Sequence, residues 1–280
     1  MNLTEEIKKN VRSGLAEDIG SGDLTALLTE NEKNLDARVV CREKATLCGK
    51  RWFDASFHLL SPDVSIRWHV QDGDKIAKEQ VVCEIKGRAR VLLTAERTAL
   101  NFLQTLSAIA TKTRQYVDAV STIKAEIVDT RKTLPGLRLA QKYAVTCGGG
   151  TNHRLGLYDG ILIKENHIIA AGGIEQALNQ AKSIQPSSDV FIQIEVETLD
   201  ELRRALSAGA EMVLLDNFSL TQLREAVDLS KQLAHGPVLL EASGNITLDT
   251  VKAVAETGVD RISVGSLTKD VKAIDLSMRF

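Results

Sequence analysis

FIQIEVETLDELRRALSAGAEMVLLD, residues 191–216, is the stretch that decides the predicted fold. It begins with an apolar run, continues with apolar residues at helical spacing up to a glycine, and ends with a second apolar run. An apolar strand, an amphipathic helix and another apolar strand form the repeating unit of parallel α/β proteins. Because both strand segments are apolar on both faces, we expect a sheet that is buried on both sides.

The same unit recurs along the chain from about residue 123 onward. Four more segments have the character of strands: AEIVDT at 125–130, GILIK at 160–164, PVLLEA at 237–242 and RISVG at 261–265. The strand centres lie roughly 20 to 35 residues apart, as βα units do. At least six such units, with no GxGxxG sequence after the first strand, favour a closed α/β barrel over a doubly wound sheet.

The first 110 or so residues have a different pattern. Stretches of period-two alternation flank the turn sequence QDGD at 71–74, which indicates an antiparallel sheet with helices packed on it. A long helix, from about residue 94 to about residue 120, then leads into the barrel. We therefore predict an α+β domain with the connecting helix at residues 1–112, and an α/β barrel domain at residues 113–280.

The composition limits the classes of function. The chain has 280 residues, is 44% hydrophobic and 26% charged, and carries a net charge of −2, which argues against binding to nucleic acid or to anionic membranes. No window approaches the roughly 18 apolar residues of a membrane span, and the N-terminus lacks the apolar region of a signal peptide, so we expect a cytoplasmic protein. The four cysteines form no CxxC pair, so their spacing indicates neither a zinc site nor a disulfide framework.

Cations gather in one part of this mildly acidic chain. The segment 129–167 carries six Lys or Arg residues against three Asp or Glu. In α/β barrels the chemistry takes place at the C-terminal ends of the strands. The charged or small polar residues that end the predicted strands here are Asp129, Thr130, Arg131, Lys132, Lys164, Glu195, Asp216, Glu241, Ser243, Gly244, Asn245, Gly265 and Ser266. We expect a small, highly anionic substrate at this rim.

The cations of the rim suit a ligand that bears both carboxylate and phosphate groups. Arg131 offers planar, bidentate hydrogen bonds, and Lys132 acts as a point charge. His153 and Arg154 follow the sequence GGGTN, whose glycines let backbone amides approach an anion closely. Simpler alternatives remain open: a solvated loop for the first pair, an ordinary turn for the glycines, and a structural role for Lys164.

The carboxylates and the last two strands complete the pattern. Glu195 and Asp216 could form salt bridges with these cations, or they could hold sugar hydroxyls or a divalent cation and oppose positive charge in a transition state. The sequences EASGN at 241–245 and VGSLT at 264–268 end the last two strands, where barrels commonly bind a phosphate group. Helix capping by Asn245 or Ser266 is the competing explanation.

Longer strings identify a family that the chain resembles. They include EDIGSGDLT at 17–25, DTRKTLPGLR at 129–138 and KYAVTCGGGTNHRLGLYDGILIKENHI at 142–168. With these strings the chain resembles the quinolinate phosphoribosyltransferases, also called nicotinate-nucleotide pyrophosphorylases (carboxylating). The resemblance implies an N-terminal open-faced α+β sandwich, an incomplete α/β barrel of the seven-stranded type, and a homodimer. It also implies the transfer of phosphoribose from phosphoribosyl pyrophosphate to quinolinate, giving nicotinate mononucleotide, pyrophosphate and CO₂ in de novo NAD biosynthesis.

The resemblance also implies roles for individual residues. Lys132, Glu195 and Asp216 are expected to be catalytic, with Mg²⁺ near the two carboxylates, held through phosphoribosyl pyrophosphate and water. No organic cofactor is expected. The residues expected to bind quinolinate are Arg97, Arg131, Lys132, His153, Arg154 and Lys164, with Thr130 in the same site. Those expected at the phosphate end are Ser243, Gly244, Asn245, Gly265 and Ser266.

Arg97 lies near the start of the long helix, well before the barrel begins. Such a residue reaches a barrel rim more easily in a neighbouring subunit than in its own chain, and the resemblance implies a site shared between the subunits of the dimer. We therefore predict that Arg97 completes the site of the partner.

Three alternatives remain open. A related phosphoribosyltransferase acting on nicotinate would share the barrel, although so many cations suit a dicarboxylate better. The sequence DGDKIAKEQVVCEIKG at 72–87 faintly resembles a biotinyl or lipoyl carrier hairpin, but it has no Met-Lys-Met or equivalent lysine. A sugar-phosphate-binding barrel without catalytic activity is the third alternative, and turnover would exclude it.

Overall fold

The computed structural model describes residues 3–30, 32–234 and 236–280. The chain forms two compact units. The first unit comprises residues 1–114, 133–149 and 266–280, and the second unit comprises residues 115–132 and 150–265. The chain therefore passes between the units more than once, and the division of the chain after residue 112 stays a prediction.

The first unit is built on an antiparallel sheet, as the period-two stretches predict. Its four strands follow the order β12-β1-β5-β3, so the last strand of the chain pairs with the first. A separate antiparallel pair joins β2 to β4. The strands are β1 (Asn34–Cys41), β2 (Ala45–Thr46), β3 (Ser65–Trp68), β4 (Lys75–Ile76), β5 (Val81–Arg88) and β12 (Leu276–Arg279).

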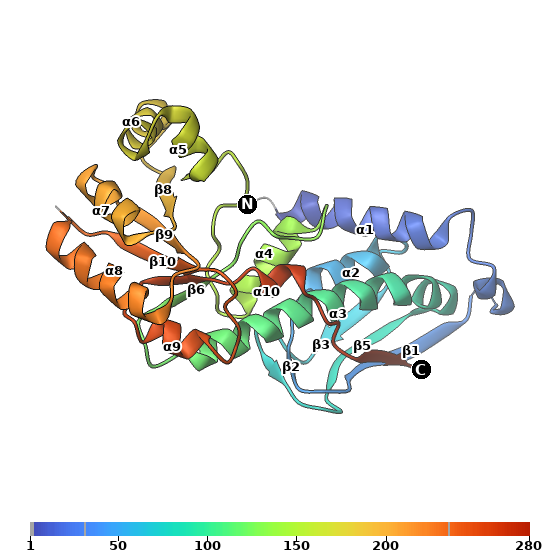
Figure 1. The fold of residues 1–280 in the computed structure, drawn as a ribbon. Coiled ribbons are helices and arrows are strands. Elements are labelled where there is room, and N and C mark those ends of the chain that lie inside the picture. The colour runs from blue at the N-terminus through green and yellow to red at the C-terminus, as the bar shows by residue number, and fades with distance from the viewer. Residues whose placement is uncertain (1–2, 31, 235) are drawn as a thin grey trace. The chain divides into compact units, whose positions relative to one another are not determined.

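Helices cover one face of this sheet. Phe53 and Phe57 of α2 and Leu100 of α3 are buried in one cluster with Val39 and Ile85 of the sheet, and α2 and α3 lie beside the strands in Figure 1. The helices are α1 (Leu3–Ile19), the 3₁₀ turn η1 (Thr25–Leu28), α2 (Lys50–His58), α3 (Ala89–Ala119), α4 (Arg138–Cys147) and α10 (Ser266–Lys269).

The long helix α3 starts at Ala89, five residues before the predicted start at about residue 94. Leu92, Ala95 and Ala99 are fully buried. Their spacing of three and four residues puts them on one helix face, which packs on the sheet. Burial of this face extends the helix back to the end of β5.

The second unit contains a parallel sheet, which confirms the predicted α/β fold. Its six strands follow the order β6-β11-β10-β9-β8-β7, and every pair is parallel. The strands are β6 (Glu126–Val128), β7 (Gly160–Ile163), β8 (Phe191–Val196), β9 (Met212–Asp216), β10 (Leu239–Ser243) and β11 (Arg261–Ser263). All six predicted strands are present.

A single residue stands where a seventh strand would lie. Thr151 forms a parallel bridge with Val128 of β6. The Thr151 N–H donates to the carbonyl of Ile127, and the Asp129 N–H donates to the carbonyl of Thr151. Successive N–H groups of a strand point to opposite edges, so Thr151 occupies the edge of β6 that β11 leaves open. The barrel of this unit therefore has six strands and one bridge in the described residues.

Helices follow the strands of the second unit and form an outer layer. Successive helices from α5 to α9 pack side by side, and α7, α8 and α9 lie outside the strands in Figure 1. They are α5 (Glu165–Ala171), α6 (Ile174–Ile184), α7 (Leu199–Ser207), α8 (Leu220–Leu233) and α9 (Val251–Ala255). None of the described helices combines the length and apolar character that crossing a membrane requires.

Candidate active site

A pocket of about 380 Å³ opens at the C-terminal ends of the strands in the second unit. This volume lies in the range of sites for small ligands. It gathers nine of the predicted site residues: Thr130, Arg131, Lys132, His153, Arg154, Lys164, Glu195, Asp216 and Ser243. Three of them lie in β8, β9 and β10, four directly follow β6 or β7, and His153 and Arg154 follow the Thr151 bridge, so the predicted meeting of the strand ends at one rim is confirmed.

Two guanidinium groups stand close together in this pocket. Burial lowers the pKa of Arg154, and the positive charge of Arg131 lowers it further. Arg154 Nη1 donates to the carbonyl of Gly160 at 3.0 Å. Arg131 Nε is buried, and among the described residues it has no hydrogen-bond partner. Burial and the neighbouring charge penalise the charged form of Arg154, and an anion bound in the pocket would offset both.

The backbone around these cations is fixed by two carboxylates, one buried and one half-buried. Asp129, which has no exposed surface, accepts a hydrogen bond from the N–H of His153 at 2.8 Å. Asp159 accepts from the N–H groups of Leu155 and Gly156 at 2.7 and 2.9 Å. The segment that carries His153 and Arg154 is therefore held at both ends, which positions the guanidinium before a ligand arrives.

His153 is held by contacts at both ring nitrogens. Its Nδ1 accepts a hydrogen bond from the N–H of Arg154 at 2.7 Å. Its Nε2 lies 2.8 Å from Oε1 of Gln193 and 3.6 Å from Oε2 of Glu241. These contacts fix the position of the ring in the pocket lining, and its predicted part in substrate binding stays a prediction.

Gln193 and Glu241 extend this contact into the protein interior. Gln193 Nε2 donates to Glu241 Oε2 at 3.0 Å, and both side chains are fully buried. Glu241 Oε1 has no hydrogen-bond partner among the described residues. We call His153, Gln193 and Glu241 the buried relay. Sequence reasoning placed Glu241 at the rim without giving it a role and did not select Gln193, although a glutamine inside the apolar run FIQIEV was a signal.

Glu195 and Asp216 lie at the ends of neighbouring strands. Lys164 Nζ donates to Glu195 Oε2 at 2.6 Å, so the salt bridge considered for Glu195 is present. Asp216 Oδ2 accepts from Asn217 Nδ2 at 2.8 Å. Each carboxylate thus commits one oxygen to these contacts. Carboxylate oxygens are the ligands that Mg²⁺ prefers, usually together with waters and substrate phosphates, so this donor set fits the expected ion.

Turns of unusual conformation follow β9 and β10. Asn217, Gly244 and Asn245 have φ angles of 57°, 106° and 46°. The Asn217 N–H donates to the carbonyl of Ser243 at 2.9 Å. A Cβ atom at position 244 would collide with Oδ1 of Asn217. Only glycine fits there, in the turn that directly follows the pocket residue Ser243.

The other predicted residues divide into two groups. A Cβ atom at Gly265 would lie 3.1 Å from Cδ of Lys132 and 3.6 Å from Oγ1 of Thr130, so Gly265 lies against the pocket wall. Arg97 and Ser266 belong to the first unit. Arg97 is exposed on α3, and Ser266 begins α10. Their predicted roles, like those of Gly244 and Asn245, stay predictions.

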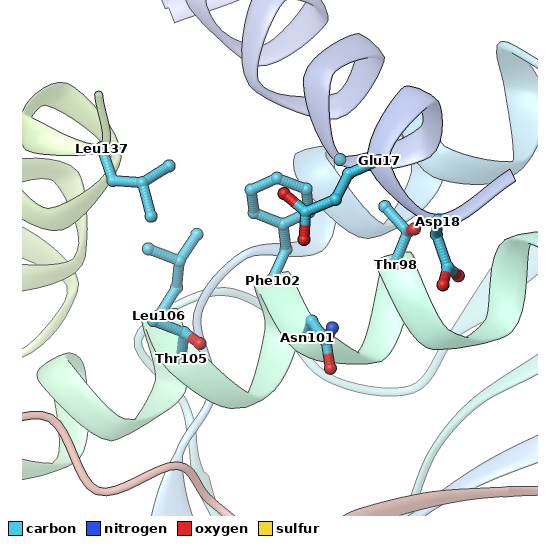
Figure 2. Close-up of a pocket in the computed structure, with 9 residues that line it drawn as sticks. Glu17, Asp18, Thr98, Asn101, Phe102, Thr105, Leu106 and Leu137 are labelled. Carbon is cyan, nitrogen blue, oxygen red and sulfur yellow. The ribbon is translucent and has the colours of Figure 1, made fainter. Parts of the chain in front are cut away.

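A smaller cavity in the first unit has a different character. Its volume is about 170 Å³, and it lies between α1 and α3. The carboxylate of Glu17 and the ring of Phe102 face the same space in Figure 2, with Leu106 pointing toward Leu137. Among the described residues that line it there are two carboxylates and no cation. It does not suit an anionic ligand.

Comparison with known proteins agrees with the site. Residues 23–107 match the family model described as quinolinate phosphoribosyl transferase, N-terminal domain, and residues 109–279 match the model of the C-terminal domain. The chain belongs to the quinolinate phosphoribosyltransferase family. The resemblance predicted from the sequence is thereby confirmed.

Relatives in this family cover the chain almost completely. The "Probable nicotinate-nucleotide pyrophosphorylase (carboxylating)" of Bacillus subtilis (strain 168) is 42% identical over 273 residues, 98% of this chain and 93% of the relative. The mitochondrial quinolinate phosphoribosyltransferase (decarboxylating) 2b of Nicotiana tabacum is 38% identical over 99% of this chain and 82% of its own. The solved nicotinate-nucleotide pyrophosphorylase of Francisella tularensis is 46% identical, with a TM-score of 0.93 over 98% of this chain and 96% of that chain.

Proposed function

We propose that this member of the family transfers phosphoribose from phosphoribosyl pyrophosphate to quinolinate and decarboxylates the product. The products are nicotinate mononucleotide, pyrophosphate and CO₂. The observation that carries the proposal is the pair of guanidinium groups, Arg131 and Arg154, in the same pocket as Glu195 and Asp216. Family membership supports the same reaction.

The cations account for the choice of substrate. Quinolinate carries two carboxylates on adjacent ring carbons. Arg131 and Arg154 can each form bidentate hydrogen bonds with a carboxylate, and Lys132 and Lys164 add point charges in the same pocket. A monocarboxylate such as nicotinate would leave part of this positive charge without a partner.

The carboxylates account for the first chemical step. Loss of pyrophosphate leaves C1 of the ribose with positive charge, and Glu195 and Asp216 can oppose that charge from fixed positions. Lys132 stabilises the negative charge of the departing pyrophosphate. Bound Mg²⁺ would neutralise further charge on the pyrophosphate, with Glu195 and Asp216 holding its water ligands.

The second step uses the charge made in the first. Attack of the pyridine nitrogen on C1 makes the ring cationic. The ring cation then stabilises the carbanion that forms when the adjacent carboxylate leaves as CO₂, and a proton takes the place of that carboxylate. Arg131 and Arg154 hold the ring during this exchange. The substrate itself supplies the electron sink, so the proposal needs no organic cofactor.

Incubation with quinolinate, phosphoribosyl pyrophosphate and Mg²⁺ tests the proposal. We expect nicotinate mononucleotide by chromatography and one CO₂ for each molecule formed. A parallel reaction with nicotinate is the control. If only nicotinate gives a product, the protein belongs to the related phosphoribosyltransferases that act on nicotinate. If neither base gives a product, the protein binds sugar phosphates without catalysing a reaction. A reaction without Mg²⁺ tests whether turnover requires the metal.

We further propose that the protein acts as a homodimer with a shared site, and that it is cytoplasmic. Leu24, Leu27 and Leu28 are 82%, 65% and 87% exposed around the η1 turn, an apolar patch that a second copy would cover. Arg97 is exposed on α3, where a partner's pocket could reach it.

Co-expression tests the shared site. Arg97→Ala and Lys132→Ala should each be nearly inactive alone. Mixed dimers would hold one doubly altered site and one intact site, and random pairing makes about half of the dimers mixed, so roughly a quarter of all sites should regain activity. If mixed dimers form and no activity returns, Arg97 acts within its own chain.

A further inference from the structure

Two cysteines that are far apart in the sequence meet in the first unit. The sulfur atoms of Cys48 and Cys147 and a carboxylate oxygen of Asp72 all lie within 4.8 Å of one another. Cys48 stands just before Gly49, which caps the start of α2, and Cys147 is the last residue of α4. We call Cys48 and Cys147 the thiol pair.

Packing fixes the backbone on both sides of the thiol pair. The N–H of Cys48 donates to Oγ of Ser107 at 3.0 Å, and the Ser107 hydroxyl donates back to the carbonyl of Cys48 at 3.1 Å. A Cβ atom at Gly148, next to Cys147, would lie 2.5 Å from Cβ of Thr113 and 2.6 Å from the carbonyl oxygen of Ala110, so α4 ends tightly against α3. The two sulfurs are therefore held close by rigid elements.

The two thiols differ in access and in acidity. Cys48 has no exposed surface, whereas Cys147 is partly exposed. The hydrogen bond with Cys48 lowers the pKa of Cys147, and the Tyr143 hydroxyl contributes to this effect. Burial raises the pKa of Cys48. The accessible sulfur is thus the one that more readily forms the nucleophilic thiolate, and the buried one keeps its proton.

A metal site is the alternative use of these side chains, and Asp72 argues against it. Asp72 Oδ1 accepts from the N–H groups of Gly49 and Lys50 at 3.0 and 3.2 Å, and Oδ2 accepts from the Tyr143 hydroxyl at 2.9 Å. The carboxylate is already engaged in holding the start of α2. A structural zinc ion needs four protein ligands, and the cluster offers three.

We propose that the thiol pair is a redox-active site that peroxides convert into an intramolecular disulfide. The Cys147 thiolate attacks one peroxide oxygen, the O–O bond breaks, and with one proton the products are a sulfenic acid on Cys147 and water. The Cys48 sulfur then attacks the sulfenic sulfur. The S–S bond forms, the S–O bond breaks, and the hydroxide leaves as water with the Cys48 proton. Both sulfurs are oxidised, and the peroxide is reduced to two water molecules.

The disulfide would link the start of α2 to the end of α4. This inference is independent of the proposed reaction in the second unit, because it depends only on residues of the first unit. Trp52, whose ring centroid lies 5.6 Å from that of Tyr143, belongs to the same buried cluster as Cys48. Its fluorescence therefore offers a signal of the change.

Treatment of the reduced full-length protein with hydrogen peroxide tests the proposal. After alkylation and digestion without reductant, we expect a peptide that links Cys48 to Cys147 and loss of two of the four thiols. We also expect tryptophan fluorescence to fall, and dithiothreitol to reverse both changes. Oxidised protein in which Cys147 carries sulfinic acid while Cys48 remains a free thiol would overturn the proposal, and so would two unreacted thiols.

Three variants separate the roles. In Cys48→Ser the oxidation by peroxide should stop at the sulfenic acid on Cys147, which dimedone traps. In Cys147→Ser the Cys48 thiol should stay reduced. Cys83→Ala, in the other buried cluster of the same unit, is the matched control and should still form the disulfide. Circular dichroism checks that each variant folds. Stoichiometric zinc that protects both thiols from peroxide would replace the proposal with a metal site.

Discussion

The pocket of the second unit and two half-buried carboxylates of the first unit differ in how far their polar groups are paired. Asp72 accepts three hydrogen bonds from its surroundings, and Asp54 accepts one from Trp68 Nε1 at 2.8 Å. In the pocket, by contrast, Arg131 Nε and Glu241 Oε1 are buried without hydrogen-bond partners among the described residues. Buried polar groups that the fold does not satisfy need an explanation, and in the pocket a bound ligand would supply one.

Removing one pocket cation should have the largest effect. Arg131→Ala should weaken quinolinate binding by about 2–5 kcal/mol, because a desolvated carboxylate loses a charged partner. Thermal stability should stay close to that of the parent protein, since Arg131 Nε has no hydrogen-bond partner among the described residues. Titration calorimetry measures the affinity, with Arg38→Ala on an exposed position of β1 as the control. Equal affinities in the two variants would remove Arg131 from the site.

Neutralising the carboxylates should reduce turnover while the fold survives. Glu195→Gln and Asp216→Asn keep the shape of each side chain, and each should lower kcat by about 100-fold or more if it opposes the ribose cation. Steady-state rates are measured beside thermal melts. Normal turnover together with a lowered Tm would mean that these groups only balance Lys164 and its neighbours.

Breaking the buried relay should affect stability first. Gln193→Met removes the contacts of Gln193 with His153 Nε2 and Glu241 Oε2, which should cost about 1–3 kcal/mol of unfolding free energy. Urea denaturation measures the loss. Gln180→Met, on the exposed face of α6, is the control and should change the stability by less than about 0.5 kcal/mol. Similar stabilities for the two variants would show that the relay is unimportant to the fold.

The smallest effect concerns the pH dependence of the first unit. Burial raises the pKa of Asp72 above its ordinary value of 3.8, so ionising this group costs the folded state more than the unfolded chain. The stability that protonated Asp72 contributes is therefore fully present below the pKa of this group in the unfolded chain. It is lost as the pH rises through the pKa of Asp72 in the folded protein. The variant Asp72→Asn has no ionisable group at this position, so its stability does not fall for this reason.

Denaturation of both proteins from about pH 3 upward gives the comparison. The stability advantage of the parent protein over Asp72→Asn should shrink as pH rises through that window. An advantage that grows with pH would mean that the hydrogen bonds to the ionised carboxylate outweigh its burial.

The pocket could be predicted from the sequence because its residues follow their strands directly. Lys164 and Asp216 each end an apolar run, and in a parallel sheet such ends meet at one edge. The thiol pair could not be predicted in this way. Cys48 and Cys147 meet through the packing of α2, α4 and α3, and no local pattern records which helix ends will touch.

The buried relay could be predicted from the sequence only in part. Gln193 interrupts an apolar strand, which is visible in the sequence, but its partners come from a loop and from β10. Likewise the repeating units predict how many strands there are, whereas the reduction of the seventh to the Thr151 bridge depends on a single pair of backbone contacts.

The strand pairing determines the order in which the two sheets can form during synthesis. Strands β8 to β11 each pair with the strand made just before, so they can add one at a time to β7 as they leave the ribosome. The strand β6 must wait for β11, and β1 must wait for β12, the last strand of the chain. Neither sheet is complete until residues 261–279 have been translated. Ribosome-bound chains that end before residue 261 therefore expose an unpaired edge in both units at once, and these are the species for which chaperones would compete with aggregation.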